Sequence, residues 1–289
     1  MAETPAPPAP PDPLADLKGH IVICGWSPVV PRVLDGIAGS EQMAGRAIVL
    51  VNQADQAEFS DLLLRYPQLD LHFIQGPYQV EQSLRRARAA TCSSAIVVAD
   101  NASGPDPDSR TLICTLEIEN MNSETKTCVE LLDKDNEPNL KRAGVDEIVV
   151  TGENSGFSLS SGALSPGIAK AARQVITFGS RGQLRREAVP QEFLGKTFGE
   201  LQEHVRTRGA MLIGVIREAA VPTIEDILGG GNDWIDVFIK TSFEAYGQDV
   251  LDRDKDRMKV FLNPVDGFEL EYKDSAILIG GTPAAVGAA

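Results

Sequence analysis

Cysteine and histidine are scarce in this chain, which has four cysteines and three histidines among 289 residues. The cysteines have no CxxC spacing, so the pattern favours buried, reduced thiols; because no export signal precedes them, a reducing cytoplasmic compartment is predicted. The histidines are scattered, and none of them indicates a catalytic group. No apolar run approaches the roughly 18 residues of a membrane-spanning helix, so we expect a soluble chain.

Basic residues are outnumbered, since 27 Lys and Arg face 41 Asp and Glu, for a formal net charge of −14. This balance argues against nucleic acid as a partner and favours cations over anions as ligands. Hydrophobic residues make up 43% and charged residues 24% of the chain. These are ordinary globular values that exclude wholesale disorder, and the length is that of about two domains.

Short β-rich runs recur at a steady interval through the first half of the chain. They are residues 20–24, 47–51, 70–74, 95–99, 127–131 and 147–150. Several are continuous apolar runs, as in strands that are buried on both faces of a parallel sheet, and helical patterns lie between them. The alternation predicts an α/β fold with a Rossmann-like, doubly wound parallel sheet over residues 19–155, after a flexible linker over 1–18. Such a sheet binds ligands at the carboxyl ends of its strands.

The pattern changes after residue 150. A Gly/Ser-rich stretch, 152–162, predicts a turn, and the apolar stretch 164–178 predicts a helix with no strand after it. We expect the segment 156–180 to close the edge of the sheet or to pack on a second copy of the chain through the face formed by Ile168, Ala172, Val175 and Ile176. Residues 181–284 predict a smaller α+β domain, interrupted over 225–259 by an acidic insertion that is too long for an ordinary connection.

The first strand runs directly into a glycine turn, where a dinucleotide-binding fold has its phosphate loop. The G-x-G-x-x-G fingerprint is one-third present, because Gly25 takes its first position but Ser27 and Val30 take the other two. The second strand ends on Asn52 and not on the acidic residue that holds a ribose. These departures disfavour NAD. They leave Gly25 as a tight turn, or Gly25, Trp26, Ser27 and Asn52 as a weak site for an adenine nucleotide.

No GxSxG elbow, HExxH pair or P-loop is present, so the sequence offers no catalytic machinery and predicts a protein that is not an enzyme.

Several segments, taken together, resemble the RCK (regulator of potassium conductance) domains of prokaryotic ligand-gated potassium channels. They are HIVICGWSPVVPRVLDGI, AIVVADN, TCVELLDKDNEPNLKRAGVDEIVV and, in the smaller domain, FLGKTFGELQEH, MLIGVIRE and KDSAILIGG. The resemblance covers residues 18–283. Its most specific parts are the CGW turn and the NLKRAGVD stretch before the sixth strand.

The resemblance implies a cytoplasmic gating ring on the inner face of the plasma membrane. In that ring, dimers assemble into an octamer beneath a membrane pore domain, and ligand binding pulls the gate. The proline-rich start would be a linker from a pore helix. The apolar helix over 164–178 would match the dimer-forming crossover helix of the family.

Calcium-gated members of the family bind the ion at the end of the fourth strand and in the fifth, and their motifs fall on Asp100 and Glu130. The second fifth-strand carboxylate falls on Leu132, although Asp133 is adjacent. The resemblance thus implies a weak site for Ca²⁺ or another divalent cation, because calcium takes six to eight oxygens. In the alternative, Asp100 caps the following turn and Glu130 pairs with a local cation.

The acidic insertion contains DVLDRDKDR, which superficially suggests a calcium loop. It lacks the glycine and the closing glutamate of an EF-hand, so a solvated loop is favoured.

The sequence therefore predicts a regulatory domain that couples binding of a cation or another effector to the gating of a potassium channel. Two alternatives remain open. A peripheral nucleotide-binding subunit of a potassium transporter would favour an intact glycine fingerprint, and an NAD-dependent oxidoreductase would need a hydride-transfer site that the sequence does not supply.

Overall fold

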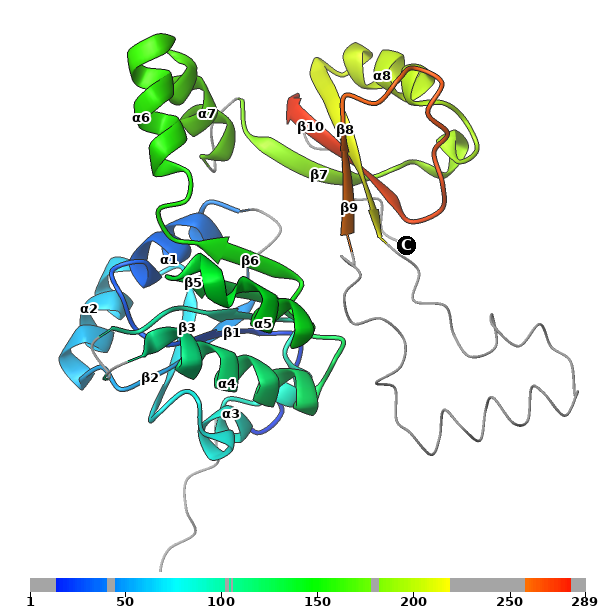
Figure 1. The fold of residues 1–289 in the computed structure, drawn as a ribbon. Helices are drawn as coiled ribbons and strands as arrows, with labels where there is room; N and C mark the ends of the chain where they lie inside the picture. The colour runs from blue at the N-terminus through cyan, green and yellow to red at the C-terminus, as the bar shows by residue number, and fades with distance from the viewer. Residues whose placement is uncertain are drawn as a thin grey trace, which may run out of the picture. The chain divides into compact units, whose positions relative to one another are not determined.

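The computed structural model describes residues 14–40, 45–101, 104, 106–177, 182–218 and 258–281. The chain divides into two compact units, Met1–Glu153 and Asn154–Ala289, whose elements are labelled in Figure 1. Within these described ranges, no helix is both long and apolar enough to cross a membrane.

The first unit is a six-stranded sheet in the order β3-β2-β1-β4-β5-β6, with every neighbouring pair parallel. Its strands are β1 Ile21–Cys24, β2 Ala47–Asn52, β3 Asp70–Gln75, β4 Ser94–Val97, β5 Lys126–Leu131 and β6 Glu147–Val150. Its helices are α1 Val30–Ala38, α2 Gln56–Arg65, α3 Glu81–Arg86, α4 Pro107–Met121 and α5 Glu137–Arg142, with 3-10 helices η2 Ala89–Thr91 and η3 Lys134–Asn136. The predicted Rossmann-like fold is confirmed.

Both faces of this sheet are covered, which explains why its strands are apolar without alternation. In β1, Val22 and Cys24 belong to one buried core, and Ile21 and Ile23 belong to the core on the opposite face. All four residues are at most 2% exposed. Because side chains alternate between the faces of a strand, two apolar layers require an unbroken apolar run.

The last residues of the predicted linker are attached to this unit. Leu14 is buried in the same core as Val22, and Leu17 packs against that core. The hydroxyl of Thr91 donates a hydrogen bond to the Leu17 carbonyl oxygen, at 2.9 Å. Residues 1–13 of the linker lie outside the described residues.

The segment after β6 forms two helices, α6 Ser155–Leu164 and α7 Ile168–Ile176. The predicted turn over 152–162 is wrong, because α6 occupies most of it. Glycine and serine have low helix propensity, but propensity is a weak prior, and α6 packs against α7. The helix predicted over 164–178 is present as α7, which begins only after Gly167, a residue in the left-handed region at φ 108°.

The second unit contains an antiparallel sheet in the order β7-β10-β8-β9. Its strands are β7 Leu184–Ala188, β8 Ala210–Glu218, β9 Met258–Leu262 and β10 Asp274–Gly280, with α8 Phe198–Thr207 and the 3-10 helix η4 Gln191–Phe193. Residues Phe198, Leu201 and Val205 of α8 form a core with one face of the sheet. This matches the predicted α+β arrangement of strands and short helix.

β9 was not anticipated from the sequence. Met258 and Lys259, the last two residues of the expected insertion over 225–259, lie in this strand. The rest of the insertion, including the acidic DVLDRDKDR stretch, lies outside the described residues.

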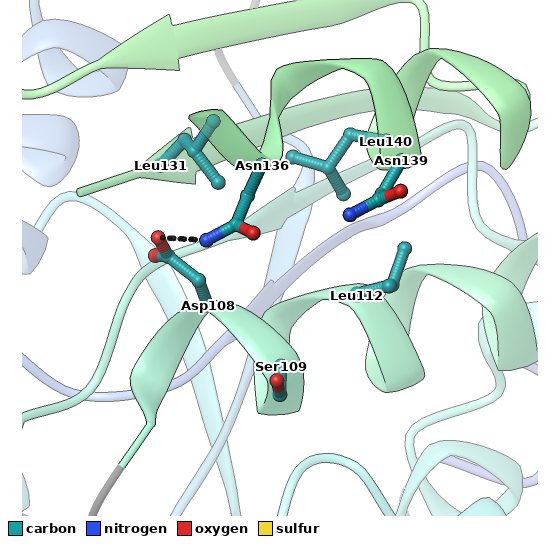
Figure 2. Close-up of a pocket in the computed structure, with 7 residues that line it drawn as sticks. All are labelled: Asp108, Ser109, Leu112, Leu131, Asn136, Asn139 and Leu140. Atoms are coloured by element: carbon teal, nitrogen blue, oxygen red, sulfur yellow. Dashed lines mark hydrogen bonds between the residues drawn. The ribbon is translucent and has the colours of Figure 1, made fainter. Parts of the chain in front are cut away.

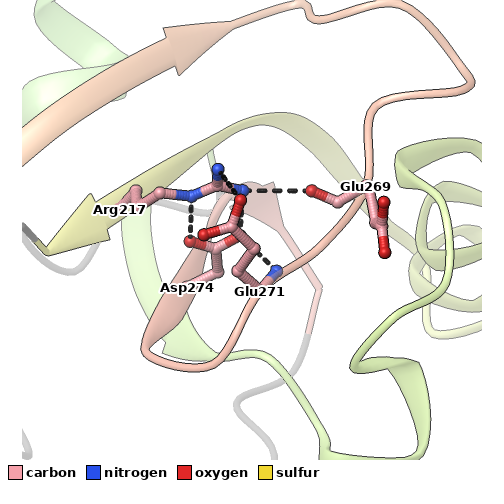
Figure 3. Close-up of polar contacts among 4 residues, drawn as sticks. All are labelled: Arg217, Glu269, Glu271 and Asp274. Carbon is pink, nitrogen blue, oxygen red and sulfur yellow. Dashed lines mark hydrogen bonds and ion pairs between the residues drawn. The ribbon is translucent and has the colours of Figure 1, made fainter. Parts of the chain in front are cut away.

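A buried carboxylate ties the end of β8 to β10. The side chain of Asp274 is fully buried, and its two oxygens accept hydrogen bonds from Nε and Nη2 of Arg217, both at 2.8 Å. Figure 3 shows that Arg217 also reaches the Glu271 carboxylate and the Glu269 carbonyl oxygen. The guanidinium lies 5.1 Å from the centre of the Phe268 ring. These contacts hold the loop that precedes β10 to both β8 and β10.

Candidate functional site

The glycine turn at the end of β1 is a position of close backbone approach. Gly25 has φ +90°, and a Cβ atom there would lie 2.3 Å from the carbonyl oxygen of Val98, just after β4. Ser27 accepts a hydrogen bond from the backbone N–H of Val29 at 3.2 Å, and the indole of Trp26 donates to Glu58 at 3.3 Å. The turn therefore brings β1 and β4 together, and its polar side chains are used locally.

Asn52, at the end of β2, is fully buried. Its Oδ1 accepts a hydrogen bond from the backbone N–H of Ala54 at 3.0 Å. Its Nδ2 has no hydrogen-bond partner among the residues that the structure describes. A buried amide nitrogen that is left unpaired costs free energy, so Asn52 offers two donors to an acceptor at this edge of the sheet.

Asp100 follows β4 and is 1% exposed. Its backbone carbonyl oxygen accepts a hydrogen bond from the guanidinium of Arg110 in α4. Burial raises the pKa of Tyr78; the neighbouring Arg110 guanidinium opposes this shift, and the Asp100 carboxylate adds to it. Asp100, Arg110 and Tyr78 thus form a polar cluster next to the end of β4. Of these three residues, the sequence indicated only Asp100.

Glu130 joins the ends of three neighbouring strands. It lies in β5, and its Oε2 accepts a hydrogen bond from the backbone N–H of Ala99, after β4, at 3.1 Å. Its Oε1 accepts a hydrogen bond from the hydroxyl of Thr151, after β6, at 2.6 Å. Among the described residues, its hydrogen-bond partners are thus a backbone N–H and a hydroxyl. A carboxylate has about four lone-pair sites, so Glu130 keeps acceptor capacity beyond these two bonds.

Asp133 has a different role from the other two predicted carboxylates. Its Oδ1 accepts a hydrogen bond from the N–H of Asp135 at 3.0 Å and caps η3. Asp100 follows β4 and Glu130 lies in the adjacent β5, and the Glu130 carboxylate accepts a hydrogen bond from the N–H of Ala99, the residue before Asp100. In the part of the chain that the structure describes, no three His, Cys, Asp or Glu side chains gather in a way that could hold a metal ion.

Asp108, in the first turn of α4, was missed by the sequence analysis. It is 6% exposed, and its carboxylate accepts hydrogen bonds from the N–H groups of Leu132 and Asp133, at 3.0 and 2.9 Å, and from Nδ2 of Asn136, at 3.2 Å. A small cavity of about 40 Å³ lies between α4 and α5, and Figure 2 shows the hydrogen bond between Asp108 and Asn136, two of the residues that line it. The sequence D-P-D-S is a helix-start pattern that could have drawn attention to it.

The comparisons with known proteins agree with this fold. The family model of the calcium-activated potassium channel slowpoke-like RCK domain matches residues 16–129. A putative potassium channel protein of Bacillus subtilis, YugO, is 26% identical over 140 residues, which are 47% of this chain and 39% of the relative. The probable ion channel SYM8 of Pisum sativum is 24% identical over 170 residues, which are 56% of this chain and 19% of the relative.

The chain therefore spans well under half of the length of these curated relatives. Among solved structures, the human SLO3 gating ring shares the fold with a TM-score of 0.57 at 16% identity, over 91% of this chain and 44% of that chain. Residues 16–129, which carry most of the parallel sheet, are therefore similar to the slowpoke-like RCK domain of potassium channels.

Proposed function

We propose that this chain is the cytoplasmic, non-catalytic regulatory part of a potassium channel and couples the binding of a divalent cation to opening or closing of the pore. The observation that carries the proposal is the position of Glu130, whose carboxylate connects the ends of β4, β5 and β6 in the unit whose residues 16–129 match the RCK family model.

The proposed effector site consists of the carboxylates of Glu130 and Asp100, with backbone carbonyl or water oxygens completing the shell of a weak calcium site. Glu130 would coordinate the cation through its remaining lone pairs. The hydroxyl of Thr151, which donates a hydrogen bond to the carboxylate, would instead coordinate the cation through its oxygen. Only a few residues separate Thr151 from α6. A cation at Glu130 would thus act on the connection that leads into the α6–α7 helix pair.

We also propose that two copies of the chain pair through α7 and that the dimers assemble into a ring beneath a membrane pore domain. The two isoleucines of the predicted face, Ile168 and Ile176, are 50% and 71% exposed. In α6, Phe157 and Leu159 are also exposed. Apolar side chains gathered on two neighbouring helices are typical of a protein–protein interface.

A thermal-unfolding titration with CaCl₂ tests the cation site. We expect calcium to raise Tm in the native chain and to have no effect in an Asp100→Asn, Glu130→Gln double variant. The oxygen of the carboxamide can still accept a hydrogen bond from the N–H of Ala99, and its nitrogen can donate one to the hydroxyl of Thr151, so the fold is retained. The exposed Glu124→Gln is the matched control and should respond like the native chain. An equal response in the double variant would reject the site.

An adenine nucleotide is the second candidate effector, favoured by the unpaired Nδ2 of Asn52 beside the glycine turn. It would place the chain in a peripheral regulatory subunit of a potassium transporter. NAD or ATP should then raise Tm in the native chain and not in Asn52→Leu. The remaining alternative, an NAD-dependent oxidoreductase, would in addition show reduction of NAD.

A further inference from the structure

β9 is an edge strand of the antiparallel sheet and has β8 as its one neighbour among the described strands. The side chains of Val260 and Leu262 are 56% and 66% exposed. The register pairs Val260 with Ile216 and Leu262 with Gly214, whereas Phe261 faces Val215, which belongs to the core under α8. Val260 and Leu262 therefore lie on the face of the sheet opposite α8, where Met211 is 62% exposed.

The register also determines which backbone groups of β9 point away from β8. The N–H of Asn263 donates to the carbonyl oxygen of Ile213 at 2.8 Å. In an antiparallel pair, hydrogen-bonded and non-hydrogen-bonded positions alternate. Phe261 and Lys259 therefore bond to β8, while Met258, Val260 and Leu262 direct their N–H and C=O groups away from it. An apolar strand with an outward row of donors and acceptors is a template for another strand.

We propose that β9 pairs with β9 of a second copy of this chain, antiparallel and centred on Val260, which would extend the two sheets into one. This inference does not depend on the proposed channel function. Around this centre, Val260 faces Val260 and Met258 faces Leu262, all at positions with outward backbone groups. About six main-chain hydrogen bonds would form across the two-fold axis.

The sequence MKVFL is self-complementary in this register, which is why a second copy is the occupant. Lys259 falls opposite Phe261 of the other copy, a cation beside an aromatic ring, and no two like charges face each other. The five residues contain no proline, and their one charged side chain is Lys259, whose backbone groups bond to β8. On the open face, Val260 and Leu262 of both copies would form one continuous apolar strip.

Cysteine cross-linking with a short bis-maleimide tests the pairing in the full chain. All four native cysteines are free, and Cys128 is the one that is not buried. Partial burial raises its pKa to about 11, which already lowers its reactivity, and a Cys128→Ser background removes it from the experiment. We expect Val260→Cys to give a covalent dimer. Val265→Cys is the matched control, since Val265 is 77% exposed and lies after β9. Because the paired strands are antiparallel and centred on Val260, the two copies of Val265 lie beyond opposite ends of the pairing.

Equal cross-linking at both positions, or none at Val260→Cys, would overturn the proposal. Val260→Pro gives a second measurement by sedimentation velocity. It removes an outward N–H and no bond to β8, so the chain should fold while its self-association weakens at least tenfold. Val260→Thr keeps the N–H and should retain the association. Persistence of the native association in a folded Val260→Pro variant would contradict edge pairing.

Discussion

Gly25 sets how closely β1 and β4 approach at the carboxyl edge of the parallel sheet. Two separate constraints act on it: a positive φ, and a carbonyl oxygen 2.3 Å from where a Cβ would stand. Backbone atoms on the β4 side cannot move aside without disturbing the N–H of Val98, which donates to the Cys24 carbonyl oxygen at 2.8 Å. The glycine is therefore needed for strand packing, whether or not a nucleotide binds there.

Replacing Gly25 by alanine should lower the free energy of unfolding by roughly 3 kcal/mol or more, from backbone strain together with the clash. Gly152→Ala is a matched control, since Gly152 has φ +85° and no atom within 4 Å of an added Cβ. That variant should lose only about 1–2 kcal/mol. Urea unfolding measures both, and equal losses would show that the approach to Val98 costs nothing.

At the scale of the element, hydrogen bonds from one side chain hold two or more segments together. Asp108 connects the start of α4 to the turn after β5, and Glu130 connects three strand ends. In the second unit, Asp274 does the same for β8 and β10 through Arg217. Each of these carboxylates is a point where a single substitution would loosen a junction between elements.

Arg217→Met should destabilise the second unit by about 3–5 kcal/mol, because it leaves the buried Asp274 carboxylate without its cation. Arg217→Lys should lose less, since it keeps the charge but not the two-pronged geometry. An Arg217→Met, Asp274→Leu double variant should recover much of the loss. Urea unfolding monitored by circular dichroism measures the free energy of unfolding of each variant. A double variant no more stable than Arg217→Met would contradict the account.

On the scale of the whole molecule, the chain carries a formal charge of −14, which opposes association of copies at low ionic strength. Apolar contact has to outweigh that repulsion. The exposed isoleucines of α7 would supply one such surface, and the edge strand β9 would supply another. If both proposed interfaces form, each chain has two distinct two-fold contacts and can assemble beyond a dimer, as a ring requires.

Ile168→Asp with Val175→Asp should abolish pairing through α7. The measurement is sedimentation velocity in the Val260→Pro background, so that edge pairing does not mask the effect, and the expected product is a monomer. Added salt should strengthen pairing in the parent and not in the aspartate variant. A dimer that survives both aspartates would show that α7 is not the interface.

The parallel sheet could be predicted from the sequence, because a strand that is buried on both faces leaves an unbroken run of apolar residues. The resemblance to RCK domains pointed to Asp100 at the end of the fourth strand and to Glu130 in the fifth. The sequence did not predict that Glu130 binds Ala99 and Thr151, that Asp108 is buried under the turn after β5, or that α6 is a helix; these follow from the fold. The fold also places residues 258–262 in an edge strand. The periodicity of a sequence depends on whether each residue is buried or exposed in its own element. Hydrogen-bond partners and strand neighbours that are distant in the chain depend on long-range packing, which periodicity does not report.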